Sequence, residues 1–327
     1  DFLVIGGGSG GIAGARRAAE YGARVALIEN QRMGGTCVNV GCVPKKMMWN
    51  AAHFADELTI AGDYGFPLTP PVFDWACFKT ARDTFIERLN GIYARNLESS
   101  NVDTYRGWAV FESVNNVRVG DQVLTADHVL IATGGRPATL NLPGADLAIT
   151  SDGFFELKSQ PKNPLIIGAG YIATELAGVL QSLGSNVTML LRKDILLRGF
   201  DHTLREAVTH EMQSDGVKIL TRVQLQGLKQ EATGELSFYD KSGTRHGGFD
   251  CVILATGRTP ATDAIGLEST GLTTDPSGFI LTDEWQQTPI SHLHAVGDVS
   301  RRAALTPVAI AAARRPPDRL FGDQPNA

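Results

Sequence analysis

An α/β fold is predicted for this chain by three features of its sequence. The 327 residues include 36 glycines, which suits a protein with many tight turns. Short apolar strands run directly into glycine-rich turns twice, near residue 6 and near residue 168. A helical pattern and then another apolar strand follow each turn. This order is typical of parallel sheets covered by helices, and the length is enough for two or three domains.

Composition and charge narrow the class of protein. The net charge is −5 and the basic residues are dispersed, so neither nucleic acid nor a membrane is an expected partner. The sequence contains no apolar run of membrane-spanning length, and it starts in a strand with no signal peptide ahead of it. We therefore expect a cytoplasmic protein. Four cysteines in such a protein are not a disulfide scaffold, and no metal site is expected.

The N-terminal residues contain the first strand, turn and helix. An apolar strand is expected at 2–5, a helix at 12–21, and a second strand at 24–28 that ends at Glu29. The acid follows the turn by about 20 residues, where a carboxylate accepts hydrogen bonds from a ribose diol. Strand, turn, helix and acid in this order predict a Rossmann-like dinucleotide-binding unit.

Each glycine of the intervening turn has an expected role. Gly6 allows the tight bend, Gly8 lets the backbone approach a pyrophosphate, and Gly11 lets helix and strand pack closely. The N-terminus of the helix that follows offers amide groups and the positive end of a dipole to the phosphates.

Two cysteines, Cys37 and Cys42, follow this unit in the segment 35–45. Residues five apart in a straight helix are separated by roughly 7.5 Å along its axis, beyond the roughly 7 Å Cα separation that a disulfide allows. The segment must therefore distort to bridge them, and a strained disulfide is easily reduced. This predicts a redox-active pair. Two core thiols, or half of a four-ligand zinc site, are the alternatives. Cys77 and Cys251 have no such neighbour in sequence.

The same order of elements returns in the second half. A strand at 164–167 leads into the turn 168–173, a helix continues to Leu183, and a strand follows at 186–191. This repetition predicts a second Rossmann-like unit in the same chain.

The residues after that second strand are basic instead of acidic. Arg192 takes the place of the acid, with Lys193 next to it and Arg198 six residues further. A carboxylate there would repel a 2′-phosphate, whereas guanidinium groups bind it in charge-assisted contacts. The second site is therefore expected to prefer NADPH to NADH; the alternative is a solvated basic turn.

Three further apolar segments complete the pattern. The segments 129–134 and 252–257 both end in Ala-Thr-Gly, and 294–298 puts Asp298 at a strand end where it can hold a ribityl hydroxyl. Two nucleotide folds indicate two nucleotides bound together. A flavin is the natural intermediary between a hydride donor and a dithiol, because both exchanges move two electrons.

With these motifs the chain resembles the FAD-dependent pyridine nucleotide-disulfide oxidoreductases, and among them the glutathione reductases, over essentially its whole length. The resemblance implies that an FAD-binding domain is split by an inserted NADPH-binding domain. The FAD domain would comprise 1–138 and 261–327, and the NADPH domain 139–260.

The resemblance also implies roles for single residues. Cys37 is the thiol that attacks the substrate disulfide, and Cys42 is the thiol next to the flavin. Lys45 pairs with Glu175 beside the flavin ring, and Tyr171 covers the ring until the nicotinamide displaces it. The implied cofactor contacts are Gly6, Gly8, Ser9, Gly10, Gly11, Glu29, Thr36, Cys37, Lys45, Ala109, Thr133, Gly134, Asp298 and Thr306 for FAD, and Gly168, Ala169, Gly170, Ile172, Glu175, Arg192, Arg198, Gly257 and Arg258 for NADPH.

Glutathione disulfide is the substrate that the resemblance implies. Arg16 matches an arginine that binds a glycine carboxylate of glutathione, whereas trypanothione reductases have an acid and a tryptophan at the positions of Ala13 and Arg16. An anionic substrate favours cations, and a cationic one favours acids. The implied substrate contacts are Ser9, Arg16, Ile92, Tyr93, Asn96 and Arg314.

The sequence departs from the family near its C-terminus. There the family supplies a His-Glu dyad for proton transfer, from the dimerisation domain of the neighbouring subunit. None of the seven histidines here has the family's His-Pro-Thr context, so we expect a fragment of a longer, homodimeric enzyme; a natural short form that lacks the dyad is the alternative. The last helix is expected to break at Pro316 and Pro317.

Several alternatives stay open at this point. Trypanothione reductase, dihydrolipoamide dehydrogenase and mercuric reductase share the motifs, although Arg192 and Arg198 disfavour the second of these. A catalytically silent module that binds flavin and nucleotide is a further alternative, against which the intact cysteine pair argues.

Overall fold

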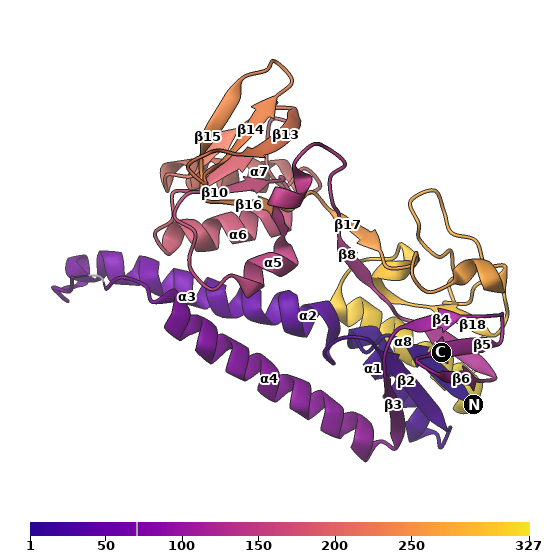
Figure 1. Cartoon of the computed structure of the whole chain (residues 1–327). Helices are drawn as coiled ribbons and strands as arrows, with labels where there is room; N and C mark the ends of the chain where they lie inside the picture. Colours follow the sequence, from indigo (N-terminus) through magenta and orange to yellow (C-terminus); the bar gives the residue numbers. More distant parts are fainter. Residues whose placement is uncertain (70) are drawn as a thin grey trace. The chain divides into compact units, whose positions relative to one another are not determined.

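The structure is a computed structural model that describes residues 1–69 and 71–327. It divides into two compact units. Unit 1 comprises Asp1–Cys42, Thr84–Arg136 and Thr259–Ala327, and unit 2 comprises Val43–Asp83 and Pro137–Arg258. Each unit contains a five-stranded sheet whose strand pairs are all parallel, which confirms the predicted α/β class (Figure 1). The predicted boundaries of the nucleotide domains stay a prediction.

The sheet of unit 1 has the order β18-β7-β1-β2-β3. Its strands are β1 (Phe2–Ile5), β2 (Val25–Glu29), β3 (Val102–Arg106), β7 (His128–Ile131) and β18 (Leu293–Ala295). From β1 the chain proceeds to β2 on one side, and β7 pairs with β1 on the other. In parallel sheets, ligands bind outside the carboxyl ends of the strands at such a reversal of strand order.

Side chains alternate between the two faces of this sheet. Phe2 and Val4 belong to a core that includes residues of α1 (Ser9–Glu20) and α8 (Thr306–Phe321). Leu3 and Ile5 belong to a second core. A small antiparallel sheet supplies part of that core, and the segment 265–272 supplies more. The small sheet contains β4 (Ala109–Phe111), β5 (Asn116–Val119) and β6 (Gln122–Thr125). The short elements of unit 1 are α2 (Gly35–Val40), η3 (Leu267–Thr270) and η4 (Gly297–Ser300).

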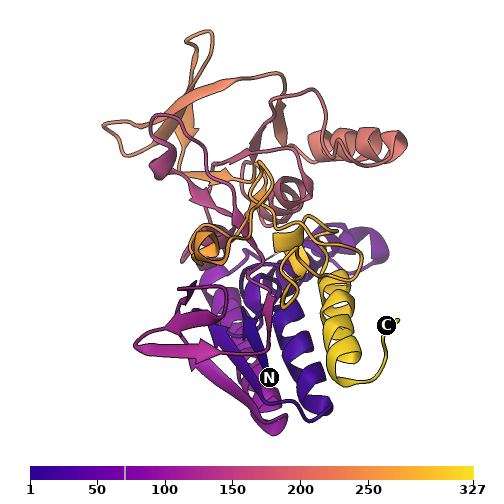
Figure 2. The same ribbon diagram turned by 90° about the vertical axis from the view of Figure 1, so that its right-hand side faces the viewer.

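Helices α1 and α8 lie side by side along one face of the sheet (Figure 2). Small residues allow this close approach. A Cβ added to Gly10 would lie 3.7 Å from Ala309 Cβ, and one added to Gly14 would lie 3.1 Å from Ala313 O. The sequence pattern predicted α1 at 12–21, but it begins at Ser9, directly after Gly8 in extended conformation.

The expected break of the last helix at Pro316 and Pro317 is wrong. Helix α8 continues through both prolines and ends at Phe321. Proline has a helical φ angle, so its cost is the missing N–H and the clash of its ring with a carbonyl. Here both prolines are buried, and the Phe321 ring packs 5.8 Å from that of Phe2. Tertiary packing therefore outweighs the local preference to break.

Unit 2 has a sheet of the order β12-β11-β10-β16-β9. Its strands are β9 (Ile149–Thr150), β10 (Pro164–Ile167), β11 (Thr188–Leu190), β12 (Lys218–Leu220) and β16 (Cys251–Leu254). Strand β11 is shorter than the expected 186–191. An antiparallel sheet shares a core with β10, β11 and β16, and it consists of β13 (Leu225–Gln230), β14 (Leu236–Asp240) and β15 (Arg245–Phe249). The helical elements of unit 2 are η1 (Ala61–Tyr64), η2 (Ala145–Leu147), α5 (Ser151–Glu156), α6 (Tyr171–Ser182) and α7 (His202–Ser214).

Four elements run through the unit boundaries: α3 (Cys42–Ile60), α4 (Trp75–Ser99), β8 (Gly135–Pro137) and β17 (Arg258–Pro260). Within residues 1–69 and 71–327, no helix is long and apolar enough to cross a membrane.

Candidate functional site

The turn after β1 is built on glycines that no other residue can replace. Gly6 has a φ of +108°, and a Cβ there would lie 2.4 Å from Ala132 O. A Cβ at Gly11 would lie 1.8 Å from Gly6 O. The helix therefore starts against the turn itself, and its first backbone bond runs from the Ile12 N–H to the Gly8 C=O over 2.9 Å. The preceding amides of α1 are left for a ligand such as a phosphate.

Glu29 is held beside this turn. Its Oε2 accepts the Gly7 N–H over 2.6 Å, and its Oε1 accepts the Gln31 N–H over 2.7 Å. An ionised carboxylate has about four acceptor positions, so these two bonds leave capacity for hydroxyl donors. The carboxylate is thus fixed at the end of β2, next to the turn that follows β1.

Two more predicted residues lie at the carboxyl ends of β7 and β18. Thr133 follows β7 next to the Gly6 turn, and its Oγ1 is buried without a hydrogen-bond partner in the part of the chain that the structure describes. Asp298 lies beside Gly135, where an added Cβ would be 3.7 Å from Asp298 Oδ2. An unsatisfied buried hydroxyl at a glycine-rich edge fits a polar ligand such as a dinucleotide. Gly134 has a φ of +70°, whereas Ala109 is a buried core residue.

The two cysteines lie on either side of a helix break. Helix α2 carries Cys37 and ends at Val40, Gly41 has a φ of −150° and a ψ of −120°, and α3 starts at Cys42. A Cβ at Gly41 would lie 2.8 Å from Thr36 O, so this bend favours glycine. The expected departure from a straight helix occurs at this residue. Both cysteines are thiols in this structure, and Cys42 is the more exposed of the two.

Contacts among Cys37, Cys42 and Thr306 control the protons of the pair. A hydrogen bond with Cys42 and burial raise the pKa of the Cys37 thiol well above its ordinary value, and a hydrogen bond with Thr306 opposes them. Thr306 Oγ1 also lies 4.0 Å from Cys42 Sγ. Burial and the Cys42 contact therefore disfavour the Cys37 thiolate, and the Thr306 hydroxyl favours it. By contrast, burial raises the pKa of Cys251 to about 12, which disfavours its thiolate.

Two asparagines that the sequence analysis missed fix the loop before Cys37. Buried Asn39 donates from Nδ2 to the carbonyls of Arg32, Met33 and Gly35 over 2.9 to 3.3 Å. Asn90, from α4, donates to Met33 O over 2.7 Å and to Asn39 Oδ1 over 2.9 Å. Gly34 N–H in turn bonds Gly7 O over 2.8 Å. The position of Asn39 between two valines, within the segment that separates the two cysteines, was a signal in the sequence, but no local pattern marked Asn90.

In unit 2, Lys45 and Glu175 are brought together. Lys45 Nζ donates to Glu175 Oε1 over 2.9 Å, and both side chains are partly exposed. Lys45 lies in the first turn of α3 and Glu175 lies in α6. This contact agrees with the expected pairing, while the role beside a flavin stays a prediction.

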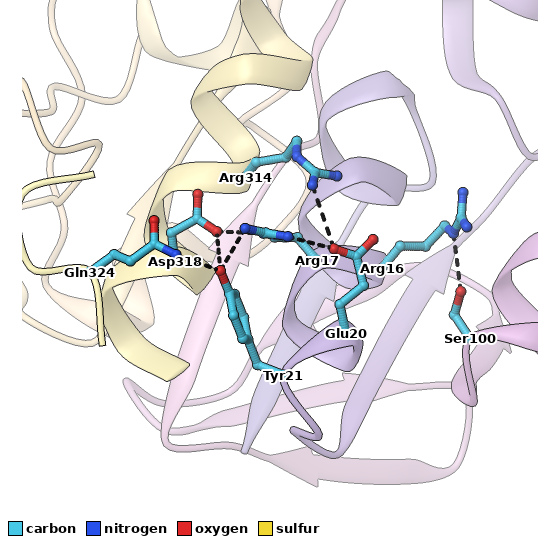
Figure 3. Close-up of polar contacts among 8 residues, drawn as sticks. All are labelled: Arg16, Arg17, Glu20, Tyr21, Ser100, Arg314, Asp318 and Gln324. Atoms are coloured by element: carbon cyan, nitrogen blue, oxygen red, sulfur yellow. Dashed lines mark hydrogen bonds and ion pairs between the residues drawn. The ribbon is translucent and has the colours of Figure 1, made fainter. Parts of the chain in front are cut away.

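The predicted substrate residues gather on α1, α4 and α8 of unit 1. Arg16 Nε donates to Ser100 Oγ over 3.1 Å (Figure 3). Ser100 Oγ in turn donates to Asn96 O over 2.9 Å. Arg314 Nη2, from α8, lies 3.5 Å from Glu20 Oε2. Glu20 follows Arg16 by one helical turn in α1. The two arginines are therefore on neighbouring helices. Ile92 and Tyr93 are partly exposed on α4, Ser9 is the first residue of α1, and Thr36 is exposed on α2.

Beside these arginines, polar side chains join α1 to α8. Arg17 forms an ion pair with Asp318 and another with Glu20 over 2.7 Å, and Tyr21 donates to Asp318 Oδ1 over 2.9 Å (Figure 3). Gln324 Nε2 donates to the Tyr21 hydroxyl over 3.1 Å. This network fixes the helix that carries Arg314 relative to the helix that carries Arg16.

The second glycine turn, in unit 2, repeats the geometry of the first. Gly168 has a φ of +146°, and a Cβ there would lie 2.2 Å from Ala255 O. The basic loop after β11 folds back on this turn, because the Leu197 N–H bonds Ala169 O over 2.7 Å. Arg192 and Arg198 are exposed on this loop.

The other residues predicted for this site lie at the start of α6 and after β16. Gly170 and Tyr171 are exposed, and Tyr171 starts α6 directly before the partly buried Ile172. Gly257 has a φ of +138° in the turn after β16. Burial raises the pKa of Asp152, and the charge of Arg258 opposes that shift.

A separate cavity of about 290 Å³ lies in unit 2, away from these residues. It is lined in part by Asn163, Asn186, Lys218 and His246. The first three lie at the amino ends of β10, β11 and β12, whereas nucleotides bind at carboxyl ends. Within the described ranges, no group of three or more His, Cys, Asp or Glu residues is arranged to hold a metal ion.

Comparison with known proteins places the chain in a family. Residues 1–313 match the pyridine nucleotide-disulphide oxidoreductase family. The chain is 42% identical to a glutathione reductase of Yarrowia lipolytica, over 98% of this chain and 72% of that protein. It is 46% identical to a glutathione reductase of Schizosaccharomyces pombe, over 98% of this chain and 71% of that protein. The chain therefore belongs to the pyridine nucleotide-disulphide oxidoreductase family and is related within it to glutathione reductases.

Proposed function

We propose that this chain carries the FAD- and NADPH-binding parts of an enzyme that reduces glutathione disulfide to glutathione with NADPH. The observation that carries the proposal is the contact among the thiols of Cys37 and Cys42 and the hydroxyl of Thr306. This pair lies in the unit that contains the first glycine turn. The family and the relatives support a disulfide reductase, and the proposal adds the electron donor and the substrate.

FAD is the cofactor that unit 1 is proposed to hold. The glycine turn and the amides of α1 would bind its pyrophosphate, Glu29 its ribose, and Thr133 and Asp298 its other polar groups. When bound, FAD accepts two electrons from NADPH and transfers them to the sulfur pair. Asn39 and Asn90 serve this site by holding the loop 32–35 against the Gly6 turn.

The sulfur chemistry belongs to the chain's own residues. Cys37 thiolate attacks one sulfur of glutathione disulfide; the S–S bond breaks, a mixed disulfide forms, and one glutathione leaves as thiolate. Cys42 thiolate then attacks Cys37 Sγ of the mixed disulfide, and the second glutathione leaves. The cysteine pair is now a disulfide, two electrons have passed to the substrate, and NADPH restores the dithiol. Each departing thiolate must take up a proton.

The substrate class follows from charge. Glutathione disulfide carries several carboxylates, and Arg16 and Arg314 lie on neighbouring helices of the same unit as the cysteines. The Nε of Arg16 is bonded to Ser100, and its Nη atoms have no partner within residues 1–69 and 71–327. Guanidinium groups bind carboxylates with charge-assisted hydrogen bonds. A cationic disulfide would be disfavoured here.

The preference for NADPH rests on the loop after β11. Arg192 and Arg198 are both exposed there, and the loop is attached to the glycine turn by Leu197. A 2′-phosphate bound at this loop would therefore lie near the pyrophosphate site. Changing Arg192→Glu together with Arg198→Leu is expected to move the preference towards NADH; an unchanged ratio of the two affinities would contradict this assignment.

The experiment that tests the proposed function separates its two halves. The flavin-loaded chain is reduced anaerobically with one equivalent of NADPH, the thiolate-to-flavin absorbance band is recorded, and glutathione disulfide is added. Rapid loss of the band is expected. If the band persists with glutathione disulfide but is lost with another disulfide, the proposal that glutathione disulfide is the substrate is refuted.

Two variants make this assay specific. Cys42→Ser is expected to bind flavin and show no band, whereas Cys77→Ser, which changes an exposed cysteine of unit 2, is expected to behave as wild type. A band that survives in Cys42→Ser would refute the assignment of the thiol next to the flavin.

A further inference from the structure

Arg222 lies beside the basic loop that follows β11. Strand β12 pairs with β11 in parallel register, with Leu190 opposite Leu220. Arg192 and Arg222 each follow these leucines by two residues. Both arginines are therefore at the carboxyl edge of the sheet, after neighbouring strands.

Backbone hydrogen bonds fix the position of Arg222. Its N–H donates to Lys193 O over 2.9 Å, and the next N–H, from Val223, donates to Leu191 O over 3.2 Å. Arg222 also has a φ of +59°, in the left-handed region that residues other than glycine rarely adopt. Strained positions of this kind are found preferentially at functional sites. Here the strain holds an arginine against the loop proposed to bind the 2′-phosphate.

The side chain of Arg222 is available for a stronger anion. Its Nη2 lies 3.8 Å from Asp194 Oδ2, and the two side chains are 78% and 63% exposed. An ion pair this long and this exposed contributes little. A phosphate monoester carries up to two negative charges and accepts charge-assisted bonds from guanidinium, so it competes well with this carboxylate.

We propose that Arg222 is a further ligand of the NADPH 2′-phosphate, supplied by the segment after β12, in addition to Arg192 and Arg198 from the loop after β11. This inference rests on the proposed use of NADPH. Cations from two neighbouring strands would contact different oxygens of one phosphate. Arg222 is therefore a specificity residue for the choice between NADPH and NADH.

The test measures binding instead of turnover. Arg222→Asn and Arg222→Gly both remove the charge, and both residues accept a positive φ. The affinities of adenosine 2′,5′-bisphosphate and of 5′-AMP are measured by calorimetry on the flavin-loaded chain. Both variants are expected to bind the bisphosphate on the order of tenfold more weakly. Their affinity for 5′-AMP should be unchanged.

Control variants give each outcome a meaning. Arg245→Asn, which changes an exposed arginine of β15 paired with Glu231, should leave both affinities unchanged. Equal losses of both ligands in the Arg222 variants would mean a disturbed loop and would overturn the inference. No loss in these variants, with a loss in Arg192→Glu, would overturn it and leave the NADPH proposal standing. A wild-type chain that does not prefer the bisphosphate would refute both.

The same Arg222 substitutions made in an Asp194→Asn variant distinguish direct binding of the phosphate from an indirect effect through Asp194. If Arg222 only neutralises Asp194, the loss should disappear in Asp194→Asn. If Arg222 binds the phosphate, the loss should persist in that background. Persistence supports the proposal, and disappearance refutes it.

Discussion

At the scale of single residues, Thr306 is a side chain that favours thiolate formation in the cysteine pair. Its hydrogen bond lowers the pKa of Cys37 while Cys42 and burial raise it. Thr306→Val keeps the shape and removes the hydroxyl. We expect the pH midpoint of thiolate formation to rise, and disulfide exchange at neutral pH to slow by severalfold, because only thiolate attacks. The measurement is the rate of iodoacetamide alkylation as a function of pH.

The matched control for this prediction is Thr306→Ser, which restores a hydroxyl at the same position. It should return the midpoint towards the wild-type value. If valine and serine shift the midpoint equally, the hydroxyl is not the cause and the prediction fails.

His294 links stability to pH. It is 4% exposed, and neither ring nitrogen has a hydrogen-bond partner in the described portion of the chain. Burial is the main cause that lowers its pKa to about 4; the charges of His128, Arg319 and His292 act in the same direction, and that of Asp283 opposes them. The unfolded chain titrates near the ordinary value of about 6.5.

The sign follows from the two protonation states. Above pH 6.5 the imidazole is neutral in both the folded and the unfolded chain, and its contribution to the free energy of unfolding is fully present. As the pH falls from about 6.5 towards 4, only the unfolded chain binds the proton, so the free energy of unfolding falls by about 3 kcal/mol in total. Denaturant unfolding at several pH values measures this.

A substitution isolates the contribution of His294 to this loss. His294→Leu should have a flatter profile in that window, with a residual slope from half-buried His128, whose pKa is also lowered by burial. Parallel profiles for the two proteins would show that other groups cause the loss.

At the scale of elements, the packing of α1 on α8 depends on Gly14. A Cβ there would lie 2.6 Å from Leu130 Cδ2, which is closer than real contacts allow, and 3.1 Å from Ala313 O of α8, which is a tight contact. We expect Gly14→Ala to lower the free energy of unfolding by about 1–3 kcal/mol through overpacking. Because α8 starts at Thr306, the same change should also disturb the thiolate midpoint. Denaturant unfolding and the alkylation profile measure the two effects.

The control is the same substitution in another helix of unit 1. At Gly91 in α4, a Cβ would approach only the end of the flexible Arg95 side chain, at 3.3 Å. Gly91→Ala should therefore stabilise by about 0.5–1 kcal/mol, since alanine favours the helix. Destabilisation of both variants to the same extent would contradict the packing explanation.

Elements with a local signal were predictable from the sequence, and elements defined by distant partners were not. The turns at Gly6 and Gly168 follow from short apolar strands and glycine spacing, so their strands and helices lie close to the expected ranges. The continuation of α8 through Pro316 depends on packing against residues about 300 positions away, such as Phe2. The partners Asn90 and Arg222 were missed for the same reason, since their contacts follow from the fold and not from spacing.

At the scale of the whole molecule, the two units differ in the charge that follows their second strand. Unit 1 has Glu29 fixed at its glycine turn, which suits a ribose diol and repels a phosphate. Unit 2 has Arg192 and Arg198 on a loop attached to its turn, with Arg222 alongside. The two units are therefore expected to take different nucleotides, although their sheets and turns are alike.

Hydrogen exchange followed by mass spectrometry tests this division of ligands. Adenosine 2′,5′-bisphosphate should slow exchange at 168–173, 191–198 and 220–223 and leave 6–11 unchanged, whereas FAD should protect 6–11. At one hundred times its dissociation constant, a ligand stabilises the bound unit by about 2.7 kcal/mol, enough to slow exchange through unfolding of that unit about a hundredfold. 5′-AMP, which lacks the 2′-phosphate, is the matched control and should protect 191–198 and 220–223 less. Protection of 6–11 by the bisphosphate would contradict the expected division, because Glu29 should repel the 2′-phosphate there.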